Sequence, residues 1–216
     1  MHDLGNGYAE QDRRAEAVRR AEEALTYYRT LTEGLERYRP YLAACLNDLG
    51  VNLTELGRYG DAENYVQEAV QLHRQLTAGN PARYRSELAR SLDILVFCRS
   101  TMDRHGEILQ LAEEAITLHR DLAEIDPDHR PELARALTNL SVGLSELRRH
   151  AEAWPAAKEA VEIYRVLVET DRLKYSPRLA RALRNLAVDY AGLNRHAEAD
   201  NCRQEADSFE HSESTL

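Results

Sequence analysis

Three arginines recur at one spacing along the chain. Arg90, Arg135 and Arg181 are separated by 45 and 46 residues. A guanidinium group presents a planar fork of N–H donors that pairs well with carboxylates and phosphates. The spacing therefore indicates either a site for an acidic peptide or another anion, or a row of arginines that are solvated or paired with acids on neighbouring helices. Both interpretations stay open, because surface ion pairs are common and weak.

Two asparagines recur in the same way, at Asn139 and Asn185. A carboxamide carries a donor and an acceptor, which match the two polar groups of a peptide bond. These side chains could therefore hydrogen-bond the backbone of an extended peptide. The alternative is that each amide bridges two adjacent helices of the protein itself.

The sequence predicts no catalytic, cofactor or metal site. His105, His150 and His196 share one repeat position, and Tyr59 occupies it elsewhere. This equivalence favours packing of a flat ring over acid–base chemistry. The chain has no His-x-x-x-His or Cys-x-x-Cys pair, no glycine-rich phosphate loop and no Gly-x-Ser-x-Gly motif, so the common signatures of zinc, nucleotide and hydrolase sites are absent.

These positions recur because the whole chain is an internal repeat of 45 to 46 residues. A leucine-rich motif marks each copy and is followed by a turn and a second common block. The four copies of the motif are Leu46-Asn47-Asp48-Leu49, Leu92-Asp93-Ile94-Leu95, Leu137-Thr138-Asn139-Leu140 and Leu183-Arg184-Asn185-Leu186. A fixed period of this size indicates stacked supersecondary units.

One repeat shows the helices that must position these residues. Pro131 is well placed at the start of a helix predicted at about 131–147, because the first helical N–H has no intrahelical partner. Apolar residues then recur every three or four positions, as on one face of a helix. A short turn at residues 148–150 precedes a second helix that ends near Thr170.

The repeated residues resemble those of the tetratricopeptide repeat (TPR) family. Its Asn-Leu-Gly pattern with a following large residue is matched at Asp48-Leu49-Gly50 with Leu53, at Asn139-Leu140 with Leu144 and at Asn185-Leu186 with Tyr190. Its small residues are matched at Ala62 and Ala69. The long period resembles the variant found in kinesin light chains and in bacterial multi-repeat TPR proteins. The resemblance implies an all-α, right-handed α-solenoid of tandem antiparallel helix pairs, with about 9–10 helices.

The predicted TPR array covers residues 1–209. It consists of a partial repeat at 1–37 and full repeats at 38–82, 83–127, 128–173 and 174–209, followed by a disordered tail at 210–216. In the partial repeat, a helix at about 12–33 is expected, with a stub of a first helix before it. That arrangement would leave Ala17, Ala21, Ala24 and Leu25 poorly covered, and a second copy of the chain could bind there.

In TPR arrays the first helix of each repeat lines the concave groove, and this implies four rows of groove residues. The rows are Asp48, Ile94, Asn139 and Asn185; Asn47, Asp93, Thr138 and Arg184; Val51, Phe97, Val142 and Val188; and Ala44, Arg90, Arg135 and Arg181. Ile94 and Phe97 either form an apolar patch in this groove or are covered by neighbouring repeats.

Composition limits the partners. The net charge of −9 argues against binding to nucleic acid or to an anionic membrane, and no apolar run approaches the ~20 residues of a membrane span. Three scattered cysteines are typical of a reducing cytoplasm, and the scarcity of lysine hints at a bacterial genome. We therefore expect a non-enzymatic cytoplasmic scaffold that binds a protein or peptide in its groove, with an acidic segment as one candidate.

Two alternatives remain for the function. The array could self-associate through its open N-terminal repeat, or serve as the sensor arm of a larger bacterial signalling protein. More remotely, it could be a receptor for a small molecule or an anion held between the groove arginines.

Overall fold

The protein is described by a computed structural model that covers the backbone of residues 2–211 and the side chains of residues 13–209. Within this part, the chain forms nine α-helices and three short 3-10 helices and has no strand. The all-α prediction is therefore confirmed. The contacts divide the chain into two compact units, unit 1 at Met1–Asp103 and unit 2 at Arg104–Leu216.

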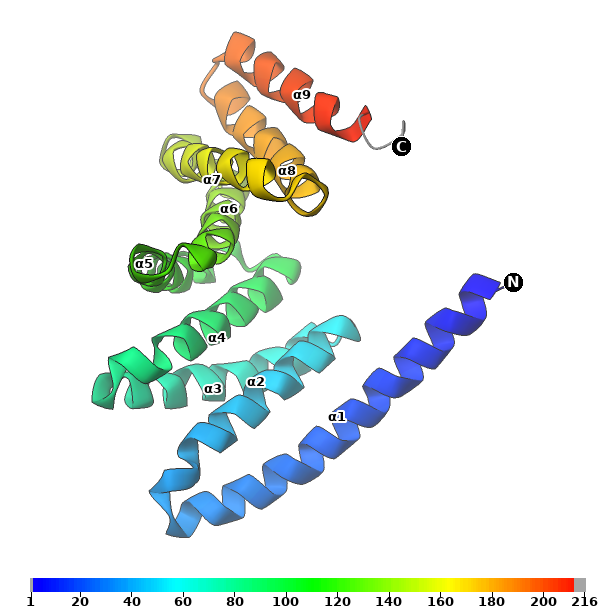
Figure 1. Cartoon of the computed structure of the whole chain (residues 1–216), viewed down its shortest axis with the longest axis vertical. Helices are drawn as coiled ribbons and strands as arrows, with labels where there is room; N and C mark the ends of the chain where they lie inside the picture. Colours follow the sequence, from blue (N-terminus) through cyan, green and yellow to red (C-terminus); the bar gives the residue numbers. More distant parts are fainter. Residues whose placement is uncertain (1, 212–216) are drawn as a thin grey trace. The chain divides into compact units, whose positions relative to one another are not determined.

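Unit 1 is a series of antiparallel helices, each packed against the next (Figure 1). Its elements are α1 at His2–Gly34, a 3-10 turn at Glu36–Tyr38, α2 at Arg39–Glu55, α3 at Tyr59–Gly79 and α4 at Pro81–Thr101. The apolar stripes of these helices meet in one core, in which Leu46, Leu49 and Leu53 of α2 are fully buried. Because α2 also contacts α4, the first helices of successive repeats lie side by side.

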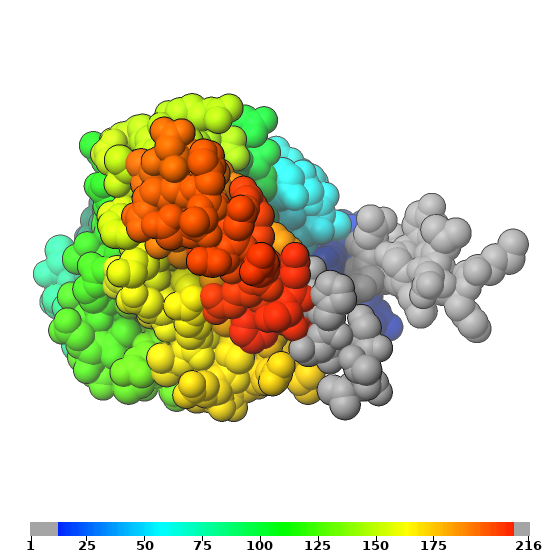
Figure 2. Space-filling view, turned by 90° about the horizontal axis from the view of Figure 1, so that it is seen from above, coloured from blue at the N-terminus to red at the C-terminus, as the bar shows by residue number. Residues whose placement is uncertain are grey.

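Unit 2 repeats this arrangement. Its elements are 3-10 turns at His105–Glu107 and Pro127–His129, α5 at Leu109–Ile125, α6 at Arg130–Glu146, α7 at His150–Thr170, α8 at Arg172–Gly192 and α9 at His196–His211. In its core, Tyr164 of α7 packs with Leu179 and Leu183 of α8. Figure 2 shows the side chains of α9, in red, lying directly against those of α8, in orange.

The same turn joins the two helices of each repeat. It contains one residue with positive φ, and these residues are Gly57 (φ 72°), Asp103 (57°), Arg148 (59°) and Asn194 (60°). Glycine and asparagine adopt this left-handed conformation more easily than most residues. The recurrence of the turn explains why the period of the sequence located the helix pairs within one or two residues.

The N-terminal segment differs from the prediction of two helices. α1 runs without a break from His2 to Gly34. Asp12 stands where the other repeats have their positive-φ residue, 45 residues before Gly57, and it lies inside the helix. The equivalent Asp103 does adopt the left-handed conformation, so the residue type at this position does not explain why the helix continues.

The expected open side of the first repeat is smaller than predicted. Leu25 is buried, and Ala21 packs against the core of unit 1, while Ala17 and Ala24 are half-buried. At the other end, α9 continues to His211, beyond the predicted boundary at residue 209. The rest of the predicted disordered tail, residues 212–216, lies outside the described residues.

Two properties of the described residues bear on function. Within residues 2–211, no helix is both long and apolar enough to cross a bilayer. In the same part of the chain, histidine, cysteine and acidic side chains do not come together in threes as ligands for a metal ion.

Close packing of α2 on α3 depends on Gly50. A Cβ atom at this position would collide with Cγ2 of Val66, which is fully buried. We therefore expect Gly50→Ala to lower the free energy of unfolding by about 1–2 kcal/mol, because overpacking outweighs the better helix propensity of alanine. Denaturant titrations of the two proteins measure the difference.

Gly60 of α3 provides the matched control, since a Cβ atom there would meet nothing within 4 Å. Gly60→Ala should leave stability unchanged or raise it by up to about 1 kcal/mol. The double variant Gly50→Ala/Val66→Ala should lose less free energy of unfolding than the two single variants lose together. Strict additivity would contradict a direct clash between the two positions.

Candidate binding surfaces on the two units

Asn139 of α6 and Asn185 of α8 lie at equivalent positions on adjacent first helices of unit 2. Both side chains are half-buried, and neither amide hydrogen-bonds to another described residue. They therefore do not bridge the two helices, which was the alternative to ligand binding. Beside them, Val142, Ser145, Glu146, Asn185 and Val188 line a shallow hollow of about 60 Å³.

The arginine row of unit 2 surrounds a buried hydroxyl group. Arg181 is exposed and forms no ion pair with the described residues, whereas Arg135 is half-buried. Burial raises the pKa of Tyr164, and the charges of Arg178, Arg181 and Arg135 oppose this rise. The Tyr164 hydroxyl itself has no hydrogen-bond partner among the described residues. This end of unit 2 therefore concentrates positive charge.

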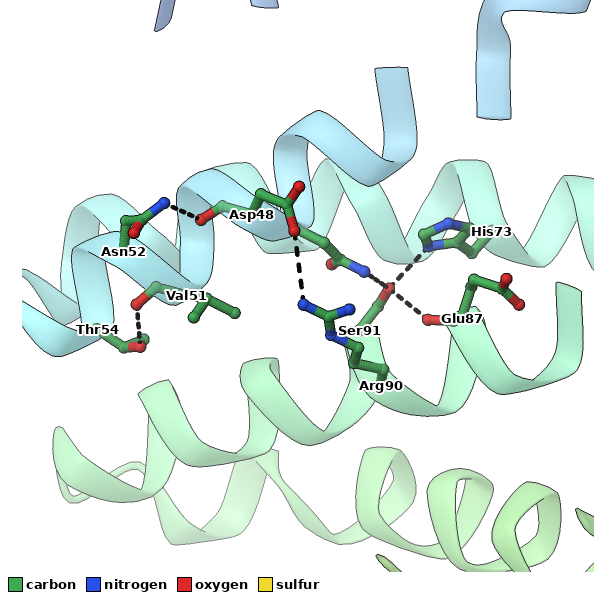
Figure 3. Close-up of polar contacts among 9 residues, drawn as sticks. Asp48, Val51, Asn52, Thr54, His73, Glu87, Arg90 and Ser91 are labelled. Atoms are coloured by element: carbon green, nitrogen blue, oxygen red, sulfur yellow. Dashed lines mark hydrogen bonds and ion pairs between the residues drawn. The ribbon is translucent and has the colours of Figure 1, made fainter. Parts of the chain in front are cut away.

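In unit 1, the arginine of the same row has an acidic neighbour. Arg90 of α4 forms an ion pair with Asp48 of α2, with 3.5 Å between Nη2 and Oδ1 (Figure 3). The two side chains are 59% and 65% exposed. An exposed pair of this length contributes little stability. The arginine row was interpreted either as an anion site or as arginines paired with acids on neighbouring helices. The structure contains the second arrangement for Arg90.

Two predicted groove side chains are buried, and a third pairs with α9. Asn47 and Thr138 are only 4% and 3% exposed. The Asn47 amide donates to Ser91 Oγ (2.8 Å), and the Thr138 hydroxyl donates to the backbone of its own helix. Their row faces the protein interior because one step along a helix turns a side chain by about 100°. Arg184 is exposed but pairs with Asp207 of α9 (3.3 Å), so it also lies away from the Asn139–Asn185 surface.

The predicted apolar patch is reduced to one ring. Ile94 packs against the core of unit 1 and is half-buried. Phe97 is 44% exposed and makes an edge-to-face contact with Tyr59 at 5.9 Å between centroids. The alternative that the repeats cover these residues therefore holds for Ile94 alone.

A pocket of about 260 Å³ opens between the first turns of α2 and α4 in unit 1. Its lining residues are Pro40, Tyr41, Ala44, Asn47, Asp48, His73, Arg83, Tyr84, Glu87 and Arg90. Sequence reasoning placed Ala44, Asn47, Asp48 and Arg90 on this surface but missed Tyr41, Tyr84 and Glu87. Of the missed residues only Tyr84 belongs to a repeated pattern, since its equivalents are Tyr38, His129 and Tyr175.

The inner end of this pocket is a hydrogen-bond network centred on Ser91 (Figure 3). Ser91 Oγ lies 2.8 Å from Asn47 Nδ2, 2.8 Å from His73 Nδ1 and 2.9 Å from the Glu87 carbonyl oxygen. A hydroxyl has one proton, and here it goes to the Glu87 carbonyl. His73 Nδ1 therefore carries a proton and donates. Burial, with a smaller effect of Arg90, lowers the pKa of His73 to about 4.

Unit 2 contains a Ser–Asp–His cluster that the sequence did not reveal. Asp189 is fully buried, and its Oδ1 contacts Ser145 Oγ (2.5 Å) and His150 Nδ1 (3.1 Å). Burial raises the pKa of Asp189, and the contacts with Ser145 and His150 oppose this rise. Both partners bond the same carboxylate oxygen, so the serine is not activated by the histidine as a nucleophile would be. The geometry is that of a structural cluster joining α6, α7 and α8.

Known proteins share this architecture. A family model described as tetratricopeptide repeat matches residues 1–32, 42–77 and 133–172. The crystal structure of a putative kinesin light chain from Podosopora anserina, with nearly identical TPR-like repeats, is 15% identical with a TM-score of 0.69, covering 100% of this chain and 95% of that one. MamA 41-end from Desulfovibrio magneticus RS-1 is 16% identical with a TM-score of 0.59, covering 94% and 96%.

These identities show similarity of fold alone. No curated protein matches the sequence.

Proposed function

Because the chain belongs to the tetratricopeptide repeat family, we propose that it is a non-enzymatic interaction module whose unit 2 binds an extended, acidic protein segment across α6 and α8. TPR proteins are in general scaffolds for protein interactions. The observation that carries the proposal is the pair of unbonded amides, Asn139 and Asn185, at matching positions on adjacent first helices.

The surrounding residues support a peptide as the ligand. Each amide can bond one peptide group of a bound segment through its donor and its acceptor. The hollow beside Val142 and Val188 suits a small apolar side chain, and Val188 is 51% exposed. Arg181 offers an unpaired guanidinium to a carboxylate of the segment. Together these groups would fix the direction of the segment and select for acidic residues.

The proposal predicts the effect of changing the amides and the arginine. With a partner isolated from the host and mapped to a segment, Asn139→Ala and Asn185→Ala should each weaken binding by about 3–10-fold, the value of one or two hydrogen bonds. Arg181→Glu should weaken it by more than tenfold and reduce its dependence on salt. Isothermal titration calorimetry at two salt concentrations measures both effects.

Lys158→Glu is the matched control. This lysine lies on α7, a second helix, and it is exposed and pairs only loosely with Glu162 (3.7 Å). The change in charge equals that of Arg181→Glu, so it should leave affinity unchanged if the first helices carry the site. Full affinity in the double variant Asn139→Ala/Asn185→Ala would refute the assignment.

A further inference from the structure

Unit 1 contains a buried hydrogen-bond acceptor that lacks a donor. Asn47 is 4% exposed and lines the pocket between α2 and α4. Its Oδ1 atom has no partner among the described residues. In this network Ser91 donates to the Glu87 carbonyl and accepts from Asn47 Nδ2, which leaves the amide oxygen without a donor. A buried acceptor without a donor is costly, so the pocket favours a ligand that brings one.

The entrance of the pocket adds aromatic faces and charges of both signs. Arg83 and Arg90 line it together with Asp48 and Glu87, and the Arg83 guanidinium lies 5.2 Å from the centroid of the Tyr84 ring. The Glu87 carboxylate is exposed and forms no ion pair with the described residues. Asp48 is held only by the long contact with Arg90, at 3.5 Å (Figure 3). Tyr41, which is 56% exposed, and Tyr84 also line the pocket. Aromatic faces attract cations, and His73 at the inner end is neutral at pH 7.

The equivalent position in unit 2 has the opposite polarity. Thr138 replaces Asn47 there, and its hydroxyl bonds the Ala134 carbonyl of its own helix. Arg178 replaces Glu87, and Ala182 replaces Ser91. The Asn47 acceptor and the Glu87 carboxylate therefore have no equivalents at these positions of unit 2, although Glu132, which replaces Tyr41, places a different buried carboxylate oxygen without a described partner there.

We propose that this pocket of unit 1 binds a lysine side chain presented by a partner protein segment. The ammonium group donates to Asn47 Oδ1 and to the carboxylates of Asp48 and Glu87, while its methylene chain lies against Tyr41 and Tyr84. Arg90 then moves away from Asp48, and Arg83 moves away from the Tyr84 ring. This site goes beyond the acidic segment proposed for unit 2, since it lies on the other unit and selects the opposite charge.

The test uses a blocked lysine as the probe. N-acetyl-lysine N-methylamide is added to the full chain, and the NMR signals of the Asn47 amide and the Tyr41 and Tyr84 rings are followed. A ligand of this size should give saturable shifts with a Kd on the order of 1 mM. The norleucine and glutamate analogues, which lack the ammonium group, should give no saturable shift. Equal responses to lysine and norleucine would overturn the proposal.

The chain itself supplies the variants. Asn47→Thr copies Thr138, whose hydroxyl is satisfied within its own helix, so the variant should fold and bind the lysine probe at least tenfold more weakly. Glu87→Arg copies Arg178 at an exposed position and should abolish binding of the lysine probe. Arg90→Ala removes the competitor for Asp48 and should tighten binding about 3-fold. Unchanged affinity in both Asn47→Thr and Glu87→Arg would also overturn the proposal.

The two proposals fail separately. Asn139→Ala and Arg181→Glu lie on unit 2 and should leave titration with the lysine probe unchanged. The affinity of an acidic segment for unit 2 should likewise be unchanged in Asn47→Thr.

Discussion

Replacing Ser91 with alanine should lower the free energy of unfolding by about 3 kcal/mol. The Ser91 hydroxyl is completely buried and accepts hydrogen bonds from Asn47 Nδ2 and His73 Nδ1. Alanine leaves both donors inside the protein without an acceptor, and each such loss costs about 1–3 kcal/mol. Urea unfolding followed by circular dichroism measures the change.

Unit 2 provides the control for Ser91→Ala, because its core is packed at the equivalent position without a serine hydroxyl. Its equivalent residues are Thr138, Tyr164 and Ala182, all of them buried. The triple variant Asn47→Thr/His73→Tyr/Ser91→Ala should therefore recover most of the lost stability. If the triple variant were less stable than Ser91→Ala, the loss would arise from packing and not from unsatisfied donors.

The period of the sequence predicted the helix pairs because one turn geometry recurs in every repeat. α6 at Arg130–Glu146 and α7 at His150–Thr170 match their predicted ranges closely. The N-terminus was mispredicted as two helices because the turn was expected one period before Gly57, where Asp12 instead continues the helix. A repeat pattern shows where a turn is usual, but Asp103 forms the turn that Asp12 does not, so the residue type at that position does not by itself decide whether the turn forms.

The candidate surfaces could be predicted only in part. The family resemblance placed the expected binding surface on the first helices, and Asn185 and Val142 line a hollow there. It could not separate Asp48, which is exposed, from its neighbour Asn47, which is buried, because single-residue steps around a helix decide burial. The Ser91 network depends on residues that differ between repeats, so the pattern that the repeats share does not predict it.

Acid should destabilise the protein through His73. This side chain is 2% exposed, and burial lowers its pKa from 6.5 to about 4 in the folded state. Between these values the unfolded chain binds a proton that the folded chain does not, so folding becomes less favourable as the pH falls. The stability linked to His73 is fully present above pH 6.5 and is lost as the pH falls to about 4. The full loss would be about 3 kcal/mol.

His73→Gln isolates this contribution from that of other titrating groups. Glutamine is neutral at every pH in this range, and its amide can still donate to Ser91 Oγ. We therefore expect the stability of the variant relative to the unmodified chain to rise steadily in urea titrations between pH 7 and pH 4.5. Parallel pH profiles would contradict a neutral His73. Because protonation would also place a positive charge at the inner end of the unit 1 pocket, binding of the lysine probe should weaken over the same range.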